Sequence, residues 1–147
     1  MDRKEYLKRL EREHEKIRRL FRELEPIMDS CIVDDPAGIK DKVERLKKTL
    51  VEHVRGEDEL FYSELRKRAV ELKQDALLPA LDLFIEEMRR ITSRAEEFFK
   101  DYSTPEDIAE RQGDFSMKLK NLEVEVLKRI ESEEKSLFYI YRAYFID

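Results

Sequence analysis

Apolar residues recur along most of the chain at alternating steps of three and four, which is the spacing of one face of an α-helix. In the first segment this stripe comprises Leu7, Leu10, Ile17, Phe21 and Leu24. Three further stripes of the same kind follow, and none of the sequence has the two-residue alternation of a useful strand. The pattern predicts helices over residues 2–30, 37–70, 76–102 and 104–145.

Short turns separate these predicted helices. Pro26 and the stretch 34–38 mark the end of the first helix and a turn, and Ser103 or Thr104 is a typical N-cap before Pro105. Long helices with short connections pack against their neighbours in opposite directions. We therefore expect an all-α fold, an antiparallel up-down four-helix bundle, with residues 1–147 as a single domain.

Charge and composition exclude several classes of function. The 30 Lys and Arg against 35 Asp and Glu give a net charge of −5, which offers no electrostatic attraction to nucleic acid or an anionic membrane. The first residues are too charged for a signal peptide, and no run approaches the ~18 apolar residues of a membrane span. The one cysteine, Cys31, cannot form an internal disulfide. These features predict a cytoplasmic protein with no nucleic-acid or membrane partner.

The two halves of the sequence are similar to each other. Residues 13–17 resemble residues 87–91 at an offset of 74, and residues 57–62 resemble residues 134–139 at an offset of 77. Such spacing predicts that the two helix pairs are copies of one hairpin. The alternative is chance similarity between charged amphipathic helices.

Both histidines of the chain occupy apolar stripe positions. His14 lies between Leu10 and Ile17, and His53 follows Leu50 in the second helix. Glu57 lies one helical turn after His53 on the same face. A carboxylate on a core stripe is costly unless it is paired or bound to a metal. Since the two histidines lie at similar distances on either side of the first turn, we expect them at one level of the bundle.

The fourth helix adds a carboxylate to this level through Glu133 and Glu134. Imidazole nitrogen together with carboxylate oxygen suits iron, manganese or zinc. The sequence therefore favours a metal site between the helices. A buried His–Glu hydrogen-bond network without metal is the alternative.

The order of these motifs resembles the hemerythrin-like (HHE) cation-binding bundles over nearly the whole chain. The motifs are His14 followed by Ile17, His53-x-x-x-Glu57 followed by Leu60-Phe61, and Glu134 followed by Leu137-Phe138. The resemblance implies two irons between four helices, one held by histidines of the first and second helices, the other by histidines of the third and fourth, with two bridging carboxylates. It implies that His14 and His53 hold the first iron and that Glu57 and Glu134 are the bridges.

The second half of that ligand set is incomplete. Met88 and Arg129 stand where the resemblance implies the other two histidines. The cation of Arg129 repels a second metal, and we expect it to pair with Glu133 or Glu57. Two carboxylates are candidates for a substitute ligand, Glu86 and Glu87.

We therefore predict one metal per chain, iron or alternatively manganese or zinc, held by His14, His53, Glu57 and Glu134. Such a site leaves coordination positions open for O2, NO or another small ligand, so it fits sensing, scavenging or metal storage. An oxidative enzyme is the least supported class, because no substrate pocket can be read from these residues.

The alternative function is a metal-free bundle that acts as a protein-interaction or regulatory module. It rests on the stretch 137–146, which is apolar around most of its helix. A helix packed on one side needs only one apolar stripe. The surplus either covers the end of the bundle or forms a homodimer contact, in which Tyr and Phe are favoured.

Overall fold

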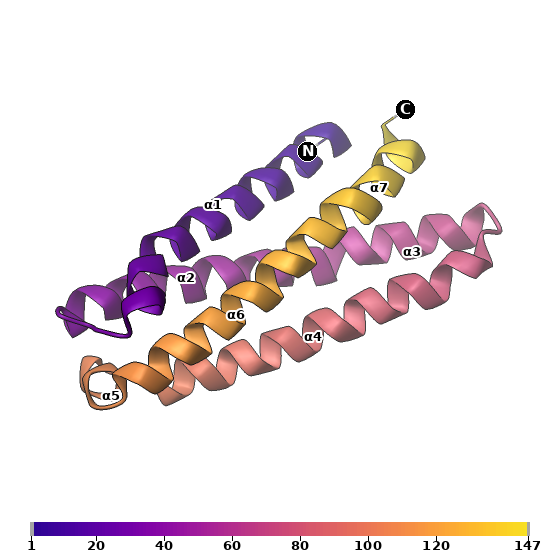
Figure 1. Cartoon of the computed structure of the whole chain (residues 1–147). Helices are drawn as coiled ribbons and strands as arrows, with labels where there is room; N and C mark the ends of the chain where they lie inside the picture. The colour runs from indigo at the N-terminus through magenta and orange to yellow at the C-terminus, as the bar shows by residue number, and fades with distance from the viewer. Residues whose placement is uncertain (1, 147) are drawn as a thin grey trace.

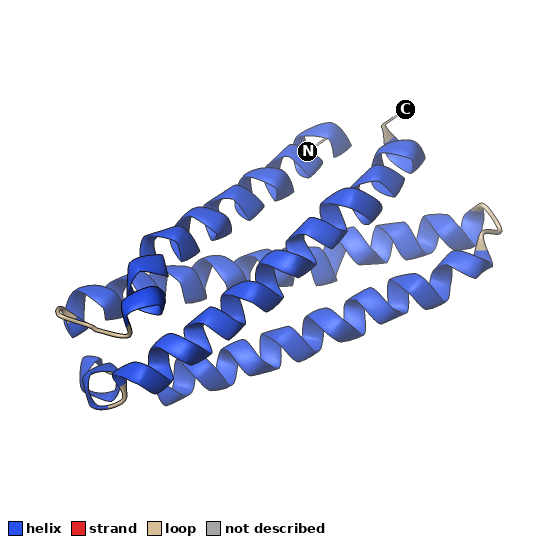
Figure 2. Cartoon of the chain, in the orientation of Figure 1, coloured by secondary structure: helices blue, strands red, loops and turns tan. Residues whose placement is uncertain are grey.

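The computed structural model describes residues 2–146, apart from the side chains of residues 58 and 59. Its elements are α1 (Arg3–Ser30), α2 (Pro36–Gly56), the π-helical η1 (Glu57–Phe61), α3 (Tyr62–Glu71), the 3-10 helix η2 (Asp75–Leu77), α4 (Leu78–Asp101), α5 (Pro105–Glu110), α6 (Gln112–Ser132), the π-helical η3 (Glu133–Leu137) and α7 (Phe138–Phe145). Within residues 2–146 there is no strand (Figure 2), so the all-α prediction is confirmed.

Several of these elements continue one another without a break. The run α2–η1–α3 makes one long rod, α6–η3–α7 makes another, and α1 and α4 are the remaining two. Figure 1 shows the chain reversing direction from each rod to the next, with both termini at the same end. Helix α1 contacts both α2 and α6, and α4 also contacts both, so every rod contributes to a shared interior.

Helix ends follow the predicted signals with two differences. Asp35 caps α2 by accepting a hydrogen bond from Gly38, and Thr104 forms a capping box with Asp107 at the start of α5. Helix α1 ends at Ser30, in agreement with the predicted range 2–30, but Pro26 lies inside the helix and does not mark its end. The chain leaves that helix where Cys31 takes a left-handed φ of 58° and its N–H bonds the carbonyl of Ile27.

The second difference is a break in the predicted helix 104–145. The backbone at Arg111 is not helical, with φ −133° and ψ 48°, so α5 and α6 are separate helices. The bend lets α5 contact α2 and bury Ile108 completely in the core. Burial of this apolar side chain stabilises the folded chain, and the helical pattern alone does not indicate it.

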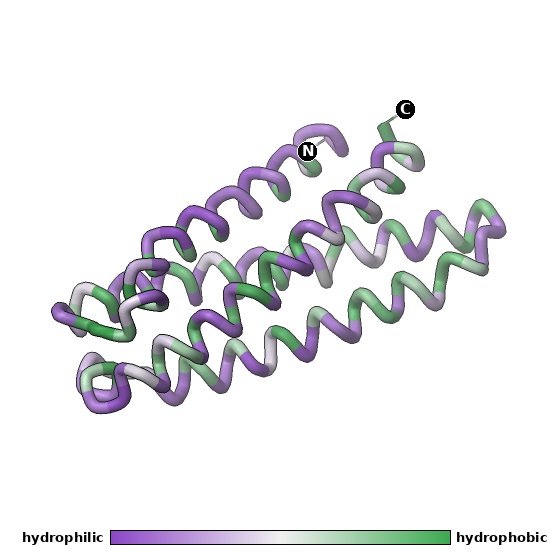
Figure 3. Tube along the Cα trace, viewed as in Figure 1, coloured by the Kyte–Doolittle hydropathy of each residue, from purple (hydrophilic) through white to green (hydrophobic). Residues whose placement is uncertain are grey.

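The core consists of two hydrophobic clusters. One contains Ile17, Leu46, Phe98, Phe115 and Ile130 among others, and the second lies toward the chain termini. Typical members of the second cluster are Leu10, Phe61, Leu81, Phe138 and Tyr141. Figure 3 shows apolar and polar residues alternating around every rod, as amphipathic helices require.

A layer of buried polar side chains separates the two clusters. On α1 the side chain between Leu10 and Ile17 is that of His14, which is fully buried. The rods α2–η1–α3 and α6–η3–α7 add His53, Glu57 and Glu133, each at most 1% exposed. The fourth rod contributes the apolar Met88 near this level.

Each π-helical segment begins at a buried glutamate of this layer. The N–H of Tyr62 bonds the carbonyl of Glu57, and the N–H of Phe138 bonds that of Glu133. In the rod α2–η1–α3, buried residues recur every four positions, at His53, Glu57, Phe61 and Leu65. Each four-residue step in a regular α-helix carries the side chain about 40° farther around the axis. The wider π-turn takes up this drift and keeps one face turned to the core.

Candidate metal centre

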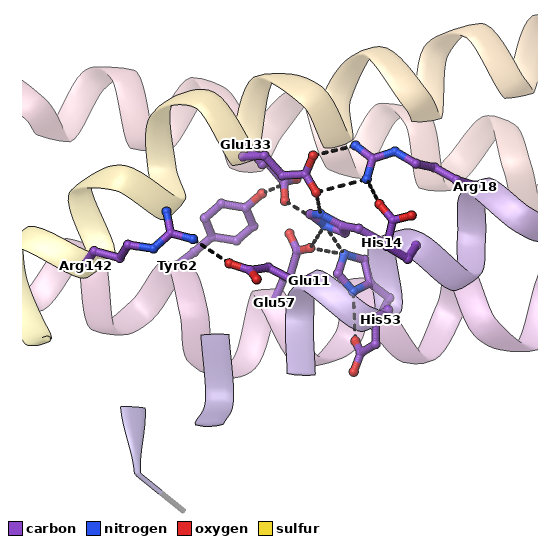
Figure 4. Close-up of polar contacts among 11 residues, drawn as sticks. Glu11, His14, Arg18, His53, Glu57, Tyr62, Glu133 and Arg142 are labelled. Atoms are coloured by element: carbon purple, nitrogen blue, oxygen red, sulfur yellow. Dashed lines mark hydrogen bonds and ion pairs between the residues drawn. The ribbon is translucent and has the colours of Figure 1, made fainter. Parts of the chain in front are cut away.

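Three rods bring two histidines and two glutamates to one point. They are His14 on α1, His53 and Glu57 at the α2–η1 junction, and Glu133 at the start of η3. One potential ligand atom from each lies within 4.8 Å of the others. Figure 4 shows the four side chains pointing toward one another.

The inner nitrogens of the two imidazoles form the middle of this group. Nε2 of His14 lies 2.9 Å from Nε2 of His53, 3.4 Å from Oε1 of Glu57 and 3.6 Å from Oε2 of Glu133. Nε2 of His53 also contacts Oε1 of Glu57. Two imidazole nitrogens and two carboxylates facing one point are a donor set suited to a transition metal.

The outer nitrogen of each imidazole is occupied by a further carboxylate. Nδ1 of His14 lies 3.0 Å from Oε2 of Glu134, and Nδ1 of His53 lies 2.8 Å from Oε1 of Glu13. When Nδ1–H donates to a carboxylate in the neutral ring, the lone pair is on Nε2, directed at the centre. Histidines that bind metals are held in this manner by carboxylates.

An arginine in turn holds each outer carboxylate. Arg18 donates to Glu134, with one nitrogen 3.2 Å from Oε2, and Nε of Arg9 donates to Glu13 at 3.1 Å. Burial raises the pKa of both carboxyls, but the hydrogen bonds from His53 to Glu13 and from Arg18 to Glu134 outweigh it and lower both values. The outer carboxylates are therefore ionised at neutral pH and remain acceptors for the histidines.

The four central groups share protons when no metal is present. Burial lowers the pKa of both histidines, but hydrogen bonds and charges of the adjacent carboxylates outweigh this effect. The pKa of His14 is raised to about 9 and that of His53 to about 10. Burial and the charge of Glu57 raise the pKa of Glu133 above its usual range. For Glu57 burial is outweighed by the charge of His53, so its pKa lies below the usual range. A metal that binds here displaces these protons.

The pH dependence of the metal-free chain follows from these shifts. Because both histidines have raised pKa values when folded, their stabilising contribution is complete below the unfolded value near 6.5 and is lost as the pH rises through about 9 to 10. The raised pKa of Glu133 acts in the same direction. We expect the free energy of unfolding of the metal-free protein, measured by urea denaturation, to fall steadily between pH 6.5 and 10.

A His53→Gln variant serves as the control for that series, because it removes one of the two histidines that titrate. Its loss of stability over the same pH range should be smaller than that of the wild-type chain. Equal stability of the metal-free wild type at pH 6.5 and pH 10 would contradict the shared-proton arrangement.

Two carboxylate oxygens of the centre lack hydrogen-bond partners among the described residues. Oε2 of Glu57 and Oε2 of Glu133 are buried and have no hydrogen-bond partner among the residues that the structure describes. Such oxygens are costly to bury, and a cation between them would satisfy both. The residues present therefore fit a metal ion.

The structure brings together three of the four predicted site residues, His14, His53 and Glu57, and adds Glu133 as the fourth. Glu134 lies outside this group of ligand atoms, at the outer nitrogen of His14. Sequence reasoning did not find Glu13, which lies at the corresponding position of His53. Its position directly before His14 was a signal in the sequence. The histidine that Glu13 contacts, however, is His53 on another helix.

The register of the internal repeat explains the exchange of Glu134 for Glu133. The sequence similarity aligns Glu57 with Glu134, whereas the π-helical segments that start at Glu57 and Glu133 are offset by 76 residues. Glu133, Leu137 and Tyr141 are buried at four-residue steps, as Glu57, Phe61 and Leu65 are. That spacing was the signal in the sequence that favoured Glu133.

The other half of the bundle has no equivalent centre in the described residues. Met88 is buried in the first hydrophobic cluster. Arg129 forms an ion pair with Glu87 and lies 4.2 Å over the ring of Phe84. The expectation that Arg129 pairs with Glu133 or Glu57 is therefore wrong.

The Arg129–Glu87 pair occupies the position that corresponds to the His53–Glu13 pair. Arg129 follows His53 by the 76 residues that separate the π-helical segments, and Glu87 follows Glu13 by the 74 residues of the first repeat. This pairing engages Glu87, while Glu86 is paired with Arg90 at 2.5 Å. Neither of the two candidate substitute ligands joins the central group.

Comparison with known proteins places the chain in a family. The family model for the hemerythrin HHE cation-binding domain matches residues 6–141. No curated protein and no solved structure matches the chain. Within the described residues, no helix is long and apolar enough to cross a membrane. The match covers almost the entire chain, including all four central residues, and the chain therefore belongs to the hemerythrin HHE cation-binding domain family.

Proposed function

We propose that the protein binds one transition-metal ion, with His14, His53, Glu57 and Glu133 as its ligands. The observation that carries the proposal is the orientation of the two imidazoles. Their Nε2 atoms lie 2.9 Å apart and face two buried carboxylates, while both Nδ1 atoms contact outer carboxylates. We also propose that the four rods form an antiparallel up-down four-helix bundle. This arrangement brings the ligands of three rods to one level.

Iron is the metal that the donor set and the family favour, with manganese and zinc as alternatives. Two imidazoles with carboxylates leave coordination positions open on a six-coordinate iron. Bound iron would supply affinity for O2 or NO, and the surrounding residues would hold it in a buried, largely apolar interior. We assign the protein a role in sensing or scavenging such a ligand, or in metal storage, in the cytoplasm.

The second half of the bundle supports a single metal rather than a pair. A second ion next to Glu57 and Glu133 would lack imidazole ligands, because Met88 and Arg129 occupy those positions. It would also experience repulsion from the guanidinium of Arg129, which is nearly buried and therefore weakly screened. Glu87 offsets part of that charge, but its ion pair with Arg129 keeps it from serving as a ligand.

The metal-free interaction module receives less support. Part of the apolar stretch 137–146 is already buried within the molecule. Leu137, Phe138 and Tyr141 pack in the second hydrophobic cluster. Tyr139 is 71% exposed and remains available for a contact. A homodimer through this stretch stays a prediction.

Metal stoichiometry tests the proposed function. Protein produced without a metal-affinity tag and loaded with ferrous iron under nitrogen should contain close to one iron per chain by elemental analysis. It should show no absorption bands of an oxo-bridged iron pair after exposure to air. Two tightly held metals would contradict the single-metal site, and a chain that holds neither iron, manganese nor zinc would contradict the proposal as a whole.

A further inference from the structure

One buried hydroxyl reaches the proposed metal centre from outside the four ligands. Tyr62 is the first residue of α3, directly after the π-helical segment η1, and is 1% exposed. Its hydroxyl lies 2.9 Å from Oε1 of Glu133, on a different rod. Figure 4 shows the phenol ring extending to this carboxylate.

The hydrogen bond makes the two oxygens of Glu133 different. A phenol keeps its proton at neutral pH, so the hydroxyl donates to Oε1. Oε2 lies 3.6 Å from Nε2 of His14 and has no hydrogen-bond partner among the described residues. One oxygen is therefore engaged from outside the centre, and the other faces it.

We propose that Tyr62 is a positioning residue that holds Glu133 by Oε1 and so presents Oε2 to the metal as a single-oxygen ligand. The inference rests on the proposed function, and it assigns this chain an outer contact that acts on a carboxylate instead of a histidine. Outer hydrogen bonds of this kind fix the direction and basicity of a ligand. A glutamate held through one oxygen also leaves a coordination position free that two-oxygen binding would fill.

The local fold explains why the hydroxyl arrives at this point. The extra residue of the π-turn places both Phe61 and Tyr62 in the interior, at 0% and 1% exposure, although they are adjacent in sequence. Their rings pack edge to face with centroids 5.5 Å apart. Because the ring is packed on all sides, the hydroxyl has a defined direction and can orient Glu133.

The test compares Tyr62→Phe with a matched control, Tyr102→Phe. Tyr102 is also fully buried and also donates to a carboxylate, that of Asp114, but it packs in the other hydrophobic cluster. Cobalt(II) serves as the probe in the full-length chain, because its visible d–d absorption reports the number and geometry of its ligands. The thermal stability of each metal-free variant is recorded in parallel.

We expect Tyr62→Phe to bind one cobalt per chain with a Kd roughly 10–100-fold higher than that of the wild type. This is the usual effect of removing a hydrogen bond to a metal ligand. Its d–d spectrum should differ from that of wild type, a change that lost packing alone would not produce. Tyr102→Phe should keep both the wild-type Kd and the wild-type spectrum.

Wild-type affinity and spectrum in Tyr62→Phe would overturn the positioning role. A visible ferric–phenolate band in the iron(III) protein, lost in Tyr62→Phe, would overturn it in another way, by making Tyr62 a ligand. Infrared spectra of the wild-type chain need no variant: carboxylate bands typical of two-oxygen binding for both glutamates would also overturn it. Failure of the wild type to bind cobalt or iron would contradict the proposed function and is measured first.

Discussion

Replacing Glu133 with glutamine will abolish tight metal binding at the proposed centre, whereas the same change at Glu134 will only weaken binding. The two side chains are adjacent in sequence and differ from glutamine by the same atoms. Glu133 is fully buried in the central group, while Glu134 is partly exposed and contacts Nδ1 of His14 from outside. The pair of variants therefore separates a ligand from an outer contact.

The physical reason lies in what each carboxylate contributes. Glutamine at position 133 would remove a negative charge from a buried site that already excludes water, where charge on the metal is weakly screened. Glutamine at position 134 would keep an acceptor for Nδ1 of His14 but give up the charge. Loss of an outer-shell partner costs roughly 10–100-fold in metal affinity, and the loss at Glu133 should exceed that range.

Competition with a coloured chelator measures both affinities for iron(II) or cobalt(II). Circular dichroism and the melting temperature of the metal-free variants control for folding. Retention of metal by Glu133→Gln together with its loss from Glu134→Gln would reverse the assignment and restore Glu134 as the ligand.

Removing a metal bound at the proposed centre will lower the stability of the protein substantially. The proposed ligands come from three rods, so the ion binds the folded chain in preference to the unfolded chain. With free metal at 100 to 1,000 times Kd, binding adds roughly 3–4 kcal/mol to the free energy of unfolding. For a chain of this size that corresponds to a fall of roughly 6–16 °C in melting temperature on chelation.

Thermal denaturation before and after chelation measures this shift, and renewed addition of metal should reverse it. The His53→Ala variant provides the control, because it lacks one proposed ligand and its melting temperature should not respond to metal or chelator. An unchanged melting curve in a wild-type sample shown to contain one metal would contradict the cross-linking of the three rods.

The helical fold and most residues of the candidate centre were predictable from the sequence. Apolar stripes are a local property, since side chains three and four residues apart share a helix face whatever the rest of the chain does. The same locality revealed His14, His53 and Glu57, because polar residues on a core stripe are conspicuous. The resemblance to hemerythrin-like bundles, rather than the periodicity, identified Met88 and Arg129 as the residues at the two other expected histidine positions.

The carboxylates that surround the histidines depend on how the rods pack. Both Glu133 and Glu134 continue the helical stripe of α6, and Glu133 is the one in register with the buried Leu137 and Tyr141 across the π-turn at η3. The contacts of Glu13 with His53 and of Glu87 with Arg129 join separate rods, and helical periodicity does not determine how two helices are rotated against each other. Packing between rods therefore determines which outer carboxylates meet His53 and Arg129.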